Sequence, residues 1–149
     1  MLKFGLLSVN PQFFMFDYNL KRKIIIQCAP LIAPVTATEL ERMNLPVKKT
    51  DKLHVESEGD FYDAVRLNLR LRTANRVLLH LFDCKADHPD QLYAEARKYP
   101  WEEVIKLKGY FNVQSKVNHP TIKDHRFASL RFKDAIADRF TSRFQKRPN

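Results

Sequence analysis

The stretch EGDFYDAVRLNLRLRTANRVLLHL, residues 58–81, determines how the first half of the chain is organised. Asp60 is a suitable N-cap, because its carboxylate can accept hydrogen bonds from the backbone of a helix's first turn. The helix that follows is predicted to bury three apolar residues that recur every four positions: Phe61, Val65 and Leu69. The apolar, β-rich run at residues 76–82 then predicts a strand.

Upstream of this stretch the sequence predicts a strand, a helix and a second strand. Residues 22–28 alternate as in a strand, with three residues directed to one face: Ile24, Ile26 and Cys28. Thr36 and Glu39 have the spacing of a capping box, which predicts the start of a helix. Residues 47–58 alternate in the manner of one half-buried strand. The order strand, helix, strand, helix, strand suits a small sheet with helices on one side.

The second half of the chain is predicted to contain two helices with a strand between them. Asp87 is expected to cap the first helix and Pro89 to lie in its first turn, while Pro100 ends it. Residues 110–117 alternate as in a strand. A last helix is expected at residues 125–144.

The last helix has an apolar stripe that is expected to be its buried side. The residues of that stripe are Leu130, Ile136, Ala137, Phe140 and Phe144. Lys133 falls inside the stripe. A lysine there must extend its amine to water, pair with a carboxylate or meet a ligand at an interface, and the sequence leaves these three alternatives open.

The chain is basic, with a formal net charge of +9, and the excess is concentrated at residues 119–149. Eight cationic residues lie there: Lys123, Arg126, Arg131, Lys133, Arg139, Arg143, Lys146 and Arg147. Such a concentration favours a polyanionic partner, because cations gain affinity by releasing the counterions condensed on phosphates. A well-solvated basic surface is the alternative that charge alone leaves open.

Several functional classes lack their usual signals. The three glycines are isolated, so no nucleotide-binding or methyltransferase glycine motif is present. The five histidines have neither i, i+4 pairing nor cysteine partners, and Glu102 and Glu103 are interpreted as charges at a helix start. No catalytic or metal-binding residue is therefore expected in this sequence.

The cysteines and the apolar runs indicate the cellular setting. Cys28 and Cys84 lie in apolar runs without CxxC spacing, so both are expected to be buried thiols in a reducing compartment, although a disulfide between them stays open. The apolar runs are far shorter than the roughly 20 residues that cross a bilayer, so no membrane association is expected. Residues 1–20 are expected to be either a poorly ordered extension or the product of a wrongly assigned start codon, rather than a signal peptide.

Three stretches of the sequence together resemble one family. Residues 58–81 resemble a segment in which a Gly-Asp turn opens a helix and Arg-Thr-Ala-x-Arg-Val leads into a strand. YPWEEV, residues 99–104, resembles a Pro-Trp-Glu-Glu junction of the same proteins. HRFASLRFKDAIADRF, residues 125–140, and RPN, residues 147–149, resemble their helix with Lys-Asp-Ala-Ile and the Arg-Pro after it. On these residues the chain resembles THUMP-containing class I S-adenosylmethionine-dependent 23S rRNA (guanine-N2)-methyltransferases.

The resemblance covers residues 21–149 and implies an α+β fold. It implies a ferredoxin-like domain at residues 21–86, packed with a THUMP domain at residues 87–149. The family continues past the position of Asn149, so the THUMP domain is expected to be truncated, with an unpaired strand edge. A catalytic domain follows in the family, so S-adenosylmethionine is expected there and no cofactor in this chain.

The resemblance also implies a cytoplasmic protein that binds structured RNA, namely large-subunit ribosomal RNA, next to a methyltransferase domain in the same or a separate chain. The basic residues expected to contact RNA are Lys123, Arg126, Lys133, Arg139, Arg143, Lys146 and Arg147. The alternative function is a protein interaction or structural module that docks onto a separate methyltransferase domain.

Overall fold

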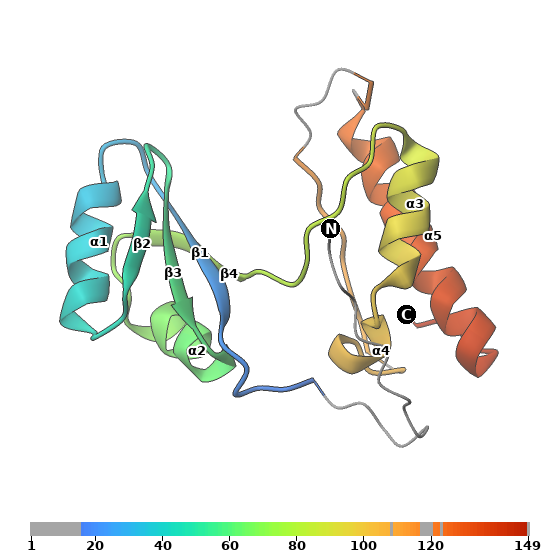
Figure 1. The fold of residues 1–149 in the computed structure, drawn as a ribbon, viewed down its shortest axis with the longest axis horizontal. Helices are drawn as coiled ribbons and strands as arrows, with labels where there is room; N and C mark the ends of the chain where they lie inside the picture. The colour runs from blue at the N-terminus through green and yellow to red at the C-terminus, as the bar shows by residue number, and fades with distance from the viewer. Residues whose placement is uncertain (1–15, 108, 117–120, 123, 149) are drawn as a thin grey trace, which may run out of the picture. The chain divides into compact units, whose positions relative to one another are not determined.

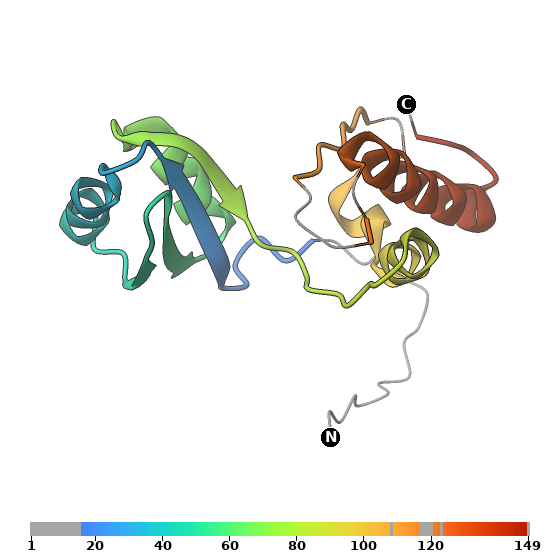
Figure 2. The same ribbon diagram turned by 90° about the horizontal axis from the view of Figure 1, so that it is seen from above.

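The computed structural model describes residues 16–107, 109–116, 121–122 and 124–148. The chain divides into two compact units (Figures 1 and 2). The sheet unit consists of Asp17–Phe82, and the helical unit is formed largely by the residues from Asp83 onward.

The sheet unit contains a four-stranded antiparallel sheet with two helices (Figure 1). Its elements in chain order are β1 (Arg22–Cys28), α1 (Ala33–Arg42), β2 (Val47–Thr50), β3 (His54–Gly59), α2 (Phe61–Arg70) and β4 (Ala74–Leu79). The strands lie in the order β2-β3-β1-β4. The β-α-β-β-α-β sequence is that of a ferredoxin-like fold, which confirms the expectation from the resemblance.

One hydrophobic core joins both helices to one face of the sheet. Ile24 and Ile26 of β1 are fully buried, as the alternation of residues 22–28 predicted. They share the core with Leu40 of α1 and Leu67 of α2, which are also fully buried. Burying these alternating strand residues against the two helices is the main contribution to the stability of this unit, because apolar burial drives folding.

The region predicted as one strand at residues 47–58 is a hairpin of two strands. β2 pairs with β3 in antiparallel register, and Val55 is buried whereas Leu53 is 48% exposed. The prediction of a single strand was wrong because the turn between the strands contains no glycine or proline to mark it.

The capping box predicted at Thr36 and Glu39 is absent. α1 begins at Ala33, with Pro34 in its first turn, and Thr36 is buried within the helix. The Glu39 carboxylate instead accepts hydrogen bonds from the backbone N–H and the hydroxyl of Thr73, the latter at 2.7 Å. The hydroxyl bond from Thr73 lowers the pKa of Glu39, and this polar contact joins α1 to the segment before β4.

The N-cap of α2 was predicted correctly, but its buried face was not. The Asp60 carboxylate accepts from the Asp63 backbone N–H at 2.8 Å, and the Asp63 carboxylate accepts from the Asp60 backbone N–H. These two reciprocal bonds form a capping box. The buried residues are Ala64 and Leu67. Three residues were predicted to be buried and are instead half-buried or exposed: Phe61, Val65 and Leu69.

The helical unit contains three helices within the described residues. These are α3 (Pro89–Lys98), α4 (Trp101–Val104) and α5 (His125–Phe144). Figures 1 and 2 show α3 running beside α5. Pro89 lies in the first turn of α3 as predicted, but His88 rather than Asp87 is the N-cap residue.

Residues 110–116, the described part of the strand predicted at residues 110–117, do not form a strand. Their side chains nevertheless alternate between partly buried and exposed, as predicted. Phe111, Val113 and Ser115 are partly buried, whereas the residues between them are exposed. Ser115 is held by α5, because its N–H donates to the Ser129 hydroxyl at 3.1 Å.

The prediction that both cysteines are buried was half wrong. Cys28 is buried, but Cys84 is exposed, and both are free thiols.

The bounds of α5 agree with the prediction, whereas its buried stripe agrees only in part. Ile136, Ala137 and Phe140 are buried, but Leu130 is 57% and Phe144 is 39% exposed. Lys133 is exposed rather than directed into the core, so it needs no buried partner. Among the helices that the structure describes, none has the length and apolarity needed to cross a membrane.

Candidate nucleic-acid interface

The candidate interface is built on α5, which carries most of the basic residues predicted to contact a polyanion. Asp124 starts this helix, since its carboxylate accepts from the Arg126 N–H at 2.8 Å and the Phe127 N–H at 3.3 Å. Lys146 and Arg147 follow the end of the helix, where Gln145 has a left-handed backbone. Lys123 lies outside the described residues.

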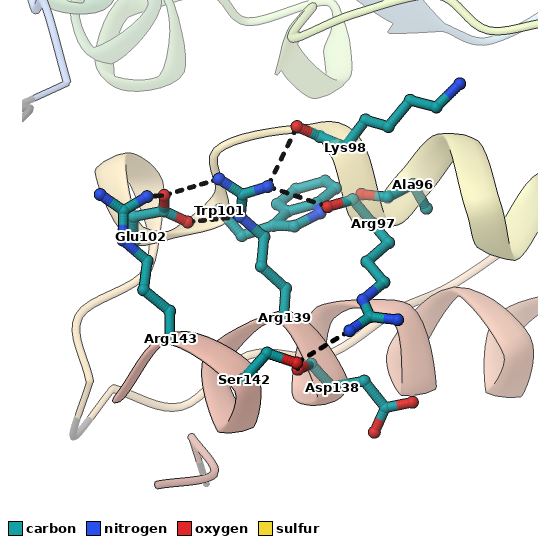
Figure 3. Close-up of polar contacts among 9 residues, drawn as sticks. All are labelled: Ala96, Arg97, Lys98, Trp101, Glu102, Asp138, Arg139, Ser142 and Arg143. Carbon is teal, nitrogen blue, oxygen red and sulfur yellow. Dashed lines mark hydrogen bonds and ion pairs between the residues drawn. The ribbon is translucent and has the colours of Figure 1, made fainter. Parts of the chain in front are cut away.

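A single carboxylate, that of Glu102 in α4, holds two arginines of α5 (Figure 3). Arg139 donates to both carboxylate oxygens, from Nε at 2.6 Å and from Nη2 at 2.7 Å. The side chain of Glu102 is 10% exposed and that of Arg139 is 21% exposed. A two-point contact of this kind, largely shielded from water, fixes the orientation of both groups.

The same arginine also binds the end of α3. Nη1 of Arg139 donates to the carbonyl oxygens of Arg97 at 2.9 Å and Lys98 at 3.1 Å (Figure 3). The last carbonyls of a helix have no partners within it and carry partial negative charge, so a guanidinium stabilises them. Arg139 therefore connects α3, α4 and α5 at one point.

Arg143 contacts the same Glu102 but is less constrained. Its Nη1 donates to Oε1 of Glu102, while its side chain is 49% exposed. Burial of Glu102 raises its pKa, but the hydrogen bonds from Arg139 and the charges of both arginines outweigh burial, so the net pKa is lowered. The carboxylate is therefore ionised at neutral pH, as both ion pairs require.

Contacts with α3 occupy a further side of α5. Arg131 forms an ion pair with Asp90 and lies 4.8 Å from the ring centre of Tyr93. The hydroxyl of Tyr93 donates to Asp138 at 2.6 Å, and this bond raises the pKa of the tyrosine. The face of α5 toward α3 is thus filled by protein contacts.

Four of the cations predicted to contact RNA are exposed to solvent. Within the described part of the chain, these four are exposed and form no ion pair: Arg126, Lys133, Lys146 and Arg147. Arg126 and Lys133 are seven residues apart, so they lie on the same side of α5 and about 10 Å apart along its axis. Arg139 and Arg143 differ from these four in being bound to Glu102.

Glu102 is the residue of this site that the sequence did not single out. Its position in the first turn of α4 fits the interpretation as a helix-start charge, but its carboxylate also binds α5. The sequence contained one signal for such a contact: Arg139 and Arg143 are one helical turn apart, and two arginines at this spacing can share one carboxylate. No cluster of three metal-binding side chains occurs among the residues that the structure describes.

Two family models match the chain, one in each unit. The RlmL ferredoxin-like domain matches residues 23–78, and the THUMP domain matches residues 86–149. Similar proteins include the ribosomal RNA large subunit methyltransferases K/L of Syntrophotalea carbinolica, 36% identical over 79% of this chain, and Psychromonas ingrahamii, 32% identical over 83%. The chain spans only 16% and 17% of the lengths of these two relatives.

Solved structures show the same fold. A predicted N6-adenine-specific DNA methylase from Listeria monocytogenes matches with a TM-score of 0.76 and 25% identity, over 85% of this chain and 33% of its own. A possible methylase from Clostridium difficile matches with a TM-score of 0.77 and 19% identity, over 85% of this chain and 34% of its own. The two family models, with the sheet topology, identify the chain as a member of the proteins that combine an RlmL ferredoxin-like domain with a THUMP domain.

Proposed function

We propose that this chain is the RNA-binding part of a ribosomal RNA methyltransferase and that it binds structured RNA through an outward cationic face. We define this face by the four unpaired cations: Arg126, Lys133, Lys146 and Arg147. The observation that carries the proposal is that these four form no ion pair within the described residues, whereas the other three arginines of α5 are ion-paired with Asp90 or Glu102. Cations without protein partners can displace the counterions of RNA phosphates.

The proposed role in the whole protein is to hold the RNA while a catalytic domain transfers a methyl group. The named relatives are large-subunit ribosomal RNA methyltransferases, which supports ribosomal RNA as the ligand and S-adenosylmethionine as the methyl donor of that domain. We propose guanine N2 as the methyl acceptor and the cytoplasm as the location, both on the resemblance of residues 58–81, 99–104 and 125–149. Arg143 is proposed to add a further contact with RNA, whereas Arg139 is proposed to position α5. Lys123, which lies outside the described residues, is proposed as an RNA contact on the sequence alone.

The proposal is tested by measuring the affinity for a ribosomal RNA hairpin across a salt series. Glutamine replaces all four residues of the cationic face in the test variant. The slope of log affinity against log salt is expected to become shallower by roughly 3, because each lost phosphate contact removes somewhat less than one released counterion.

A matched control changes the same net charge elsewhere in the helical unit. Four exposed lysines outside α5 serve for this purpose: Lys85, Lys98, Lys106 and Lys116. Their replacement by glutamine is expected to reduce the slope much less. Equal losses in both variants would show that RNA responds to net charge alone, and the assignment of the face would then be rejected.

A second candidate, docking onto a separate methyltransferase domain, is supported by exposed apolar side chains on α5. Phe127 is 47% exposed, and Leu130, one turn later, is 57% exposed. Exposed apolar groups side by side are typical of protein interfaces. Two results together would favour this function. Leu130→Ser would abolish binding to a separately expressed methyltransferase domain, and replacing all four residues of the cationic face by glutamine would leave the RNA affinity unchanged.

A further inference from the structure

The sheet unit exposes a cluster of three aromatic rings at the start of α2. The ring centres of Tyr18 and Phe61 are 5.1 Å apart, those of Phe61 and Tyr62 are 6.1 Å apart, and those of Tyr18 and Tyr62 are 6.4 Å apart. The Phe61 N–H donates to the carbonyl oxygen of Tyr18 at 3.1 Å, which fixes the segment before β1 against the helix. Phe61 is half-buried and supports the two tyrosines from behind.

The two tyrosines are not needed to fill the core. Tyr62 is 61% exposed and Tyr18 is 38% exposed, while α2 already buries Ala64 and Leu67 against the sheet. Exposed rings held by neighbouring rings lose little conformational freedom when a ligand binds, because their side chains are already ordered. The geometry therefore provides an ordered aromatic surface facing solvent.

A polar groove of about 380 Å³ is lined in part by α2, the helix that carries Tyr62. Two of its lining residues lie on α2: Asp63 directly follows Tyr62, and Arg66 lies one helical turn after Tyr62. Arg66 is paired with Asp63 at 2.9 Å, and Lys48 is paired with Glu58 at 2.9 Å. These four groove charges neutralise one another.

Lys21 is the lining cation that has no ion pair within the described residues. It also lines an adjacent groove of about 190 Å³, together with Lys23, which is likewise unpaired in the part of the chain that the structure describes. Both lysines are exposed. The charge of Lys21 reaches the Glu58 carboxylate, but Glu58 is ion-paired with Lys48, so the cations that line the two grooves outnumber the carboxylates. This excess of positive charge lies within a few residues of Tyr18.

We propose that this surface, defined by Tyr18, Tyr62 and Lys21, binds a single-stranded segment of RNA. A base stacks on the exposed ring of Tyr62, with Tyr18 beside it, and the phosphate next to that base lies against Lys21. Aromatic rings beside unpaired cations suit single strands, because every base has a π-face and every nucleotide has a phosphate. The inference rests on the proposed function, since it assigns a second RNA contact to the same chain.

The test uses the full chain and two labelled probes, a single-stranded uridine dodecamer and the ribosomal RNA hairpin. Tyr62→Ala is expected to weaken dodecamer binding about tenfold, whereas Tyr62→Phe is expected to stay within about twofold of the original. Tyr62→Leu keeps apolar area but removes the π-face, so it is expected to behave like Tyr62→Ala. Leu69→Ala is the matched control, because Leu69 is 80% exposed on the same helix.

The outcomes separate this inference from the proposed function. Dodecamer affinity that is unchanged by Tyr62→Ala, with hairpin binding intact, overturns the single-strand site alone. Failure of the unmodified chain to bind either probe overturns both. If Tyr62→Leu binds the dodecamer as well as the original chain does, stacking is rejected. If Tyr62→Ala and Leu69→Ala both reduce self-association without changing dodecamer affinity, the surface is a protein interface instead.

Discussion

The sheet unit and the helical unit join their elements by different means. In the sheet unit, fully buried aliphatic residues of two strands and two helices meet in one core, and the charged pairs lie at exposed or half-buried positions. In the helical unit, Glu102 and Arg139 connect three helices from a largely buried position. Removing an aliphatic side chain should therefore harm the first unit most, and removing a charge should harm the second.

The largest expected effect is that of Leu67→Ala in the sheet unit. Leu67 is fully buried, so its truncation is expected to lower the free energy of unfolding by about 2–5 kcal/mol through lost burial and a residual cavity. Leu69→Ala, two positions along the same helix, should change it by less than about 0.5 kcal/mol. Urea unfolding followed by circular dichroism measures both, and equal losses would contradict the observed buried face of α2.

The corresponding change in the helical unit is Arg139→Ala. It leaves Glu102 ionised and largely buried without its two-point partner and removes the donor to two α3 carbonyls. We expect a loss of about 2–3 kcal/mol, less than for a fully buried pair because both side chains retain some exposure. Trp101, the only tryptophan, is buried in this unit, so its fluorescence reports the loss. A fluorescence midpoint that does not move would show that the ion pair is dispensable.

Acid should affect the helical unit through the same carboxylate. The folded-state pKa of Glu102 is lowered, so its stabilisation is complete above the unfolded value, about 4.3, and disappears as pH falls through the folded pKa. The Trp101 unfolding midpoint is therefore expected to fall as pH decreases below about 5. Glu102→Gln should be less stable at neutral pH and should show a weaker dependence on pH. An identical pH profile for both proteins would rule out this linkage.

The sequence predicted the elements whose signals are local. The alternation at residues 22–28, the N-cap at Asp60 and the bounds of α5 all depend on neighbouring residues, and the structure confirms each. The order of the sheet unit became clear only through the family resemblance, because the turn after Thr50 has no glycine or proline to separate β2 from β3.

The errors lie where a distant segment decides the outcome. On α2, one apolar stripe contains Val65 and Leu69 and a second contains Ala64 and Leu67. Only the position of the sheet determines that the second stripe is the buried one. In the basic region, the seven cations predicted to contact RNA looked equivalent, but Glu102 binds Arg139 and Arg143 from 37 and 41 residues away. Local periodicity contains no information about such partners. The sequence could therefore locate the basic region, but it could not distinguish the cations that are ion-paired within the protein from those that are not.

Among the changes at the Glu102 site, Arg143→Ala is expected to have the smallest effect on stability, and it tests whether Arg143 differs from Arg139 in function. Arg143 is half exposed, and Glu102 keeps both contacts with Arg139 after its removal, so the loss should stay below about 1 kcal/mol. The same independence allows Arg143 to exchange Glu102 for an RNA phosphate without leaving a buried carboxylate unpaired. Arg143→Ala is therefore expected to reduce the salt slope of hairpin binding by up to about 1 while the Trp101 midpoint stays nearly constant. A large loss of stability with an unchanged salt slope would instead place Arg143 with Arg139, as a residue that holds the helices together.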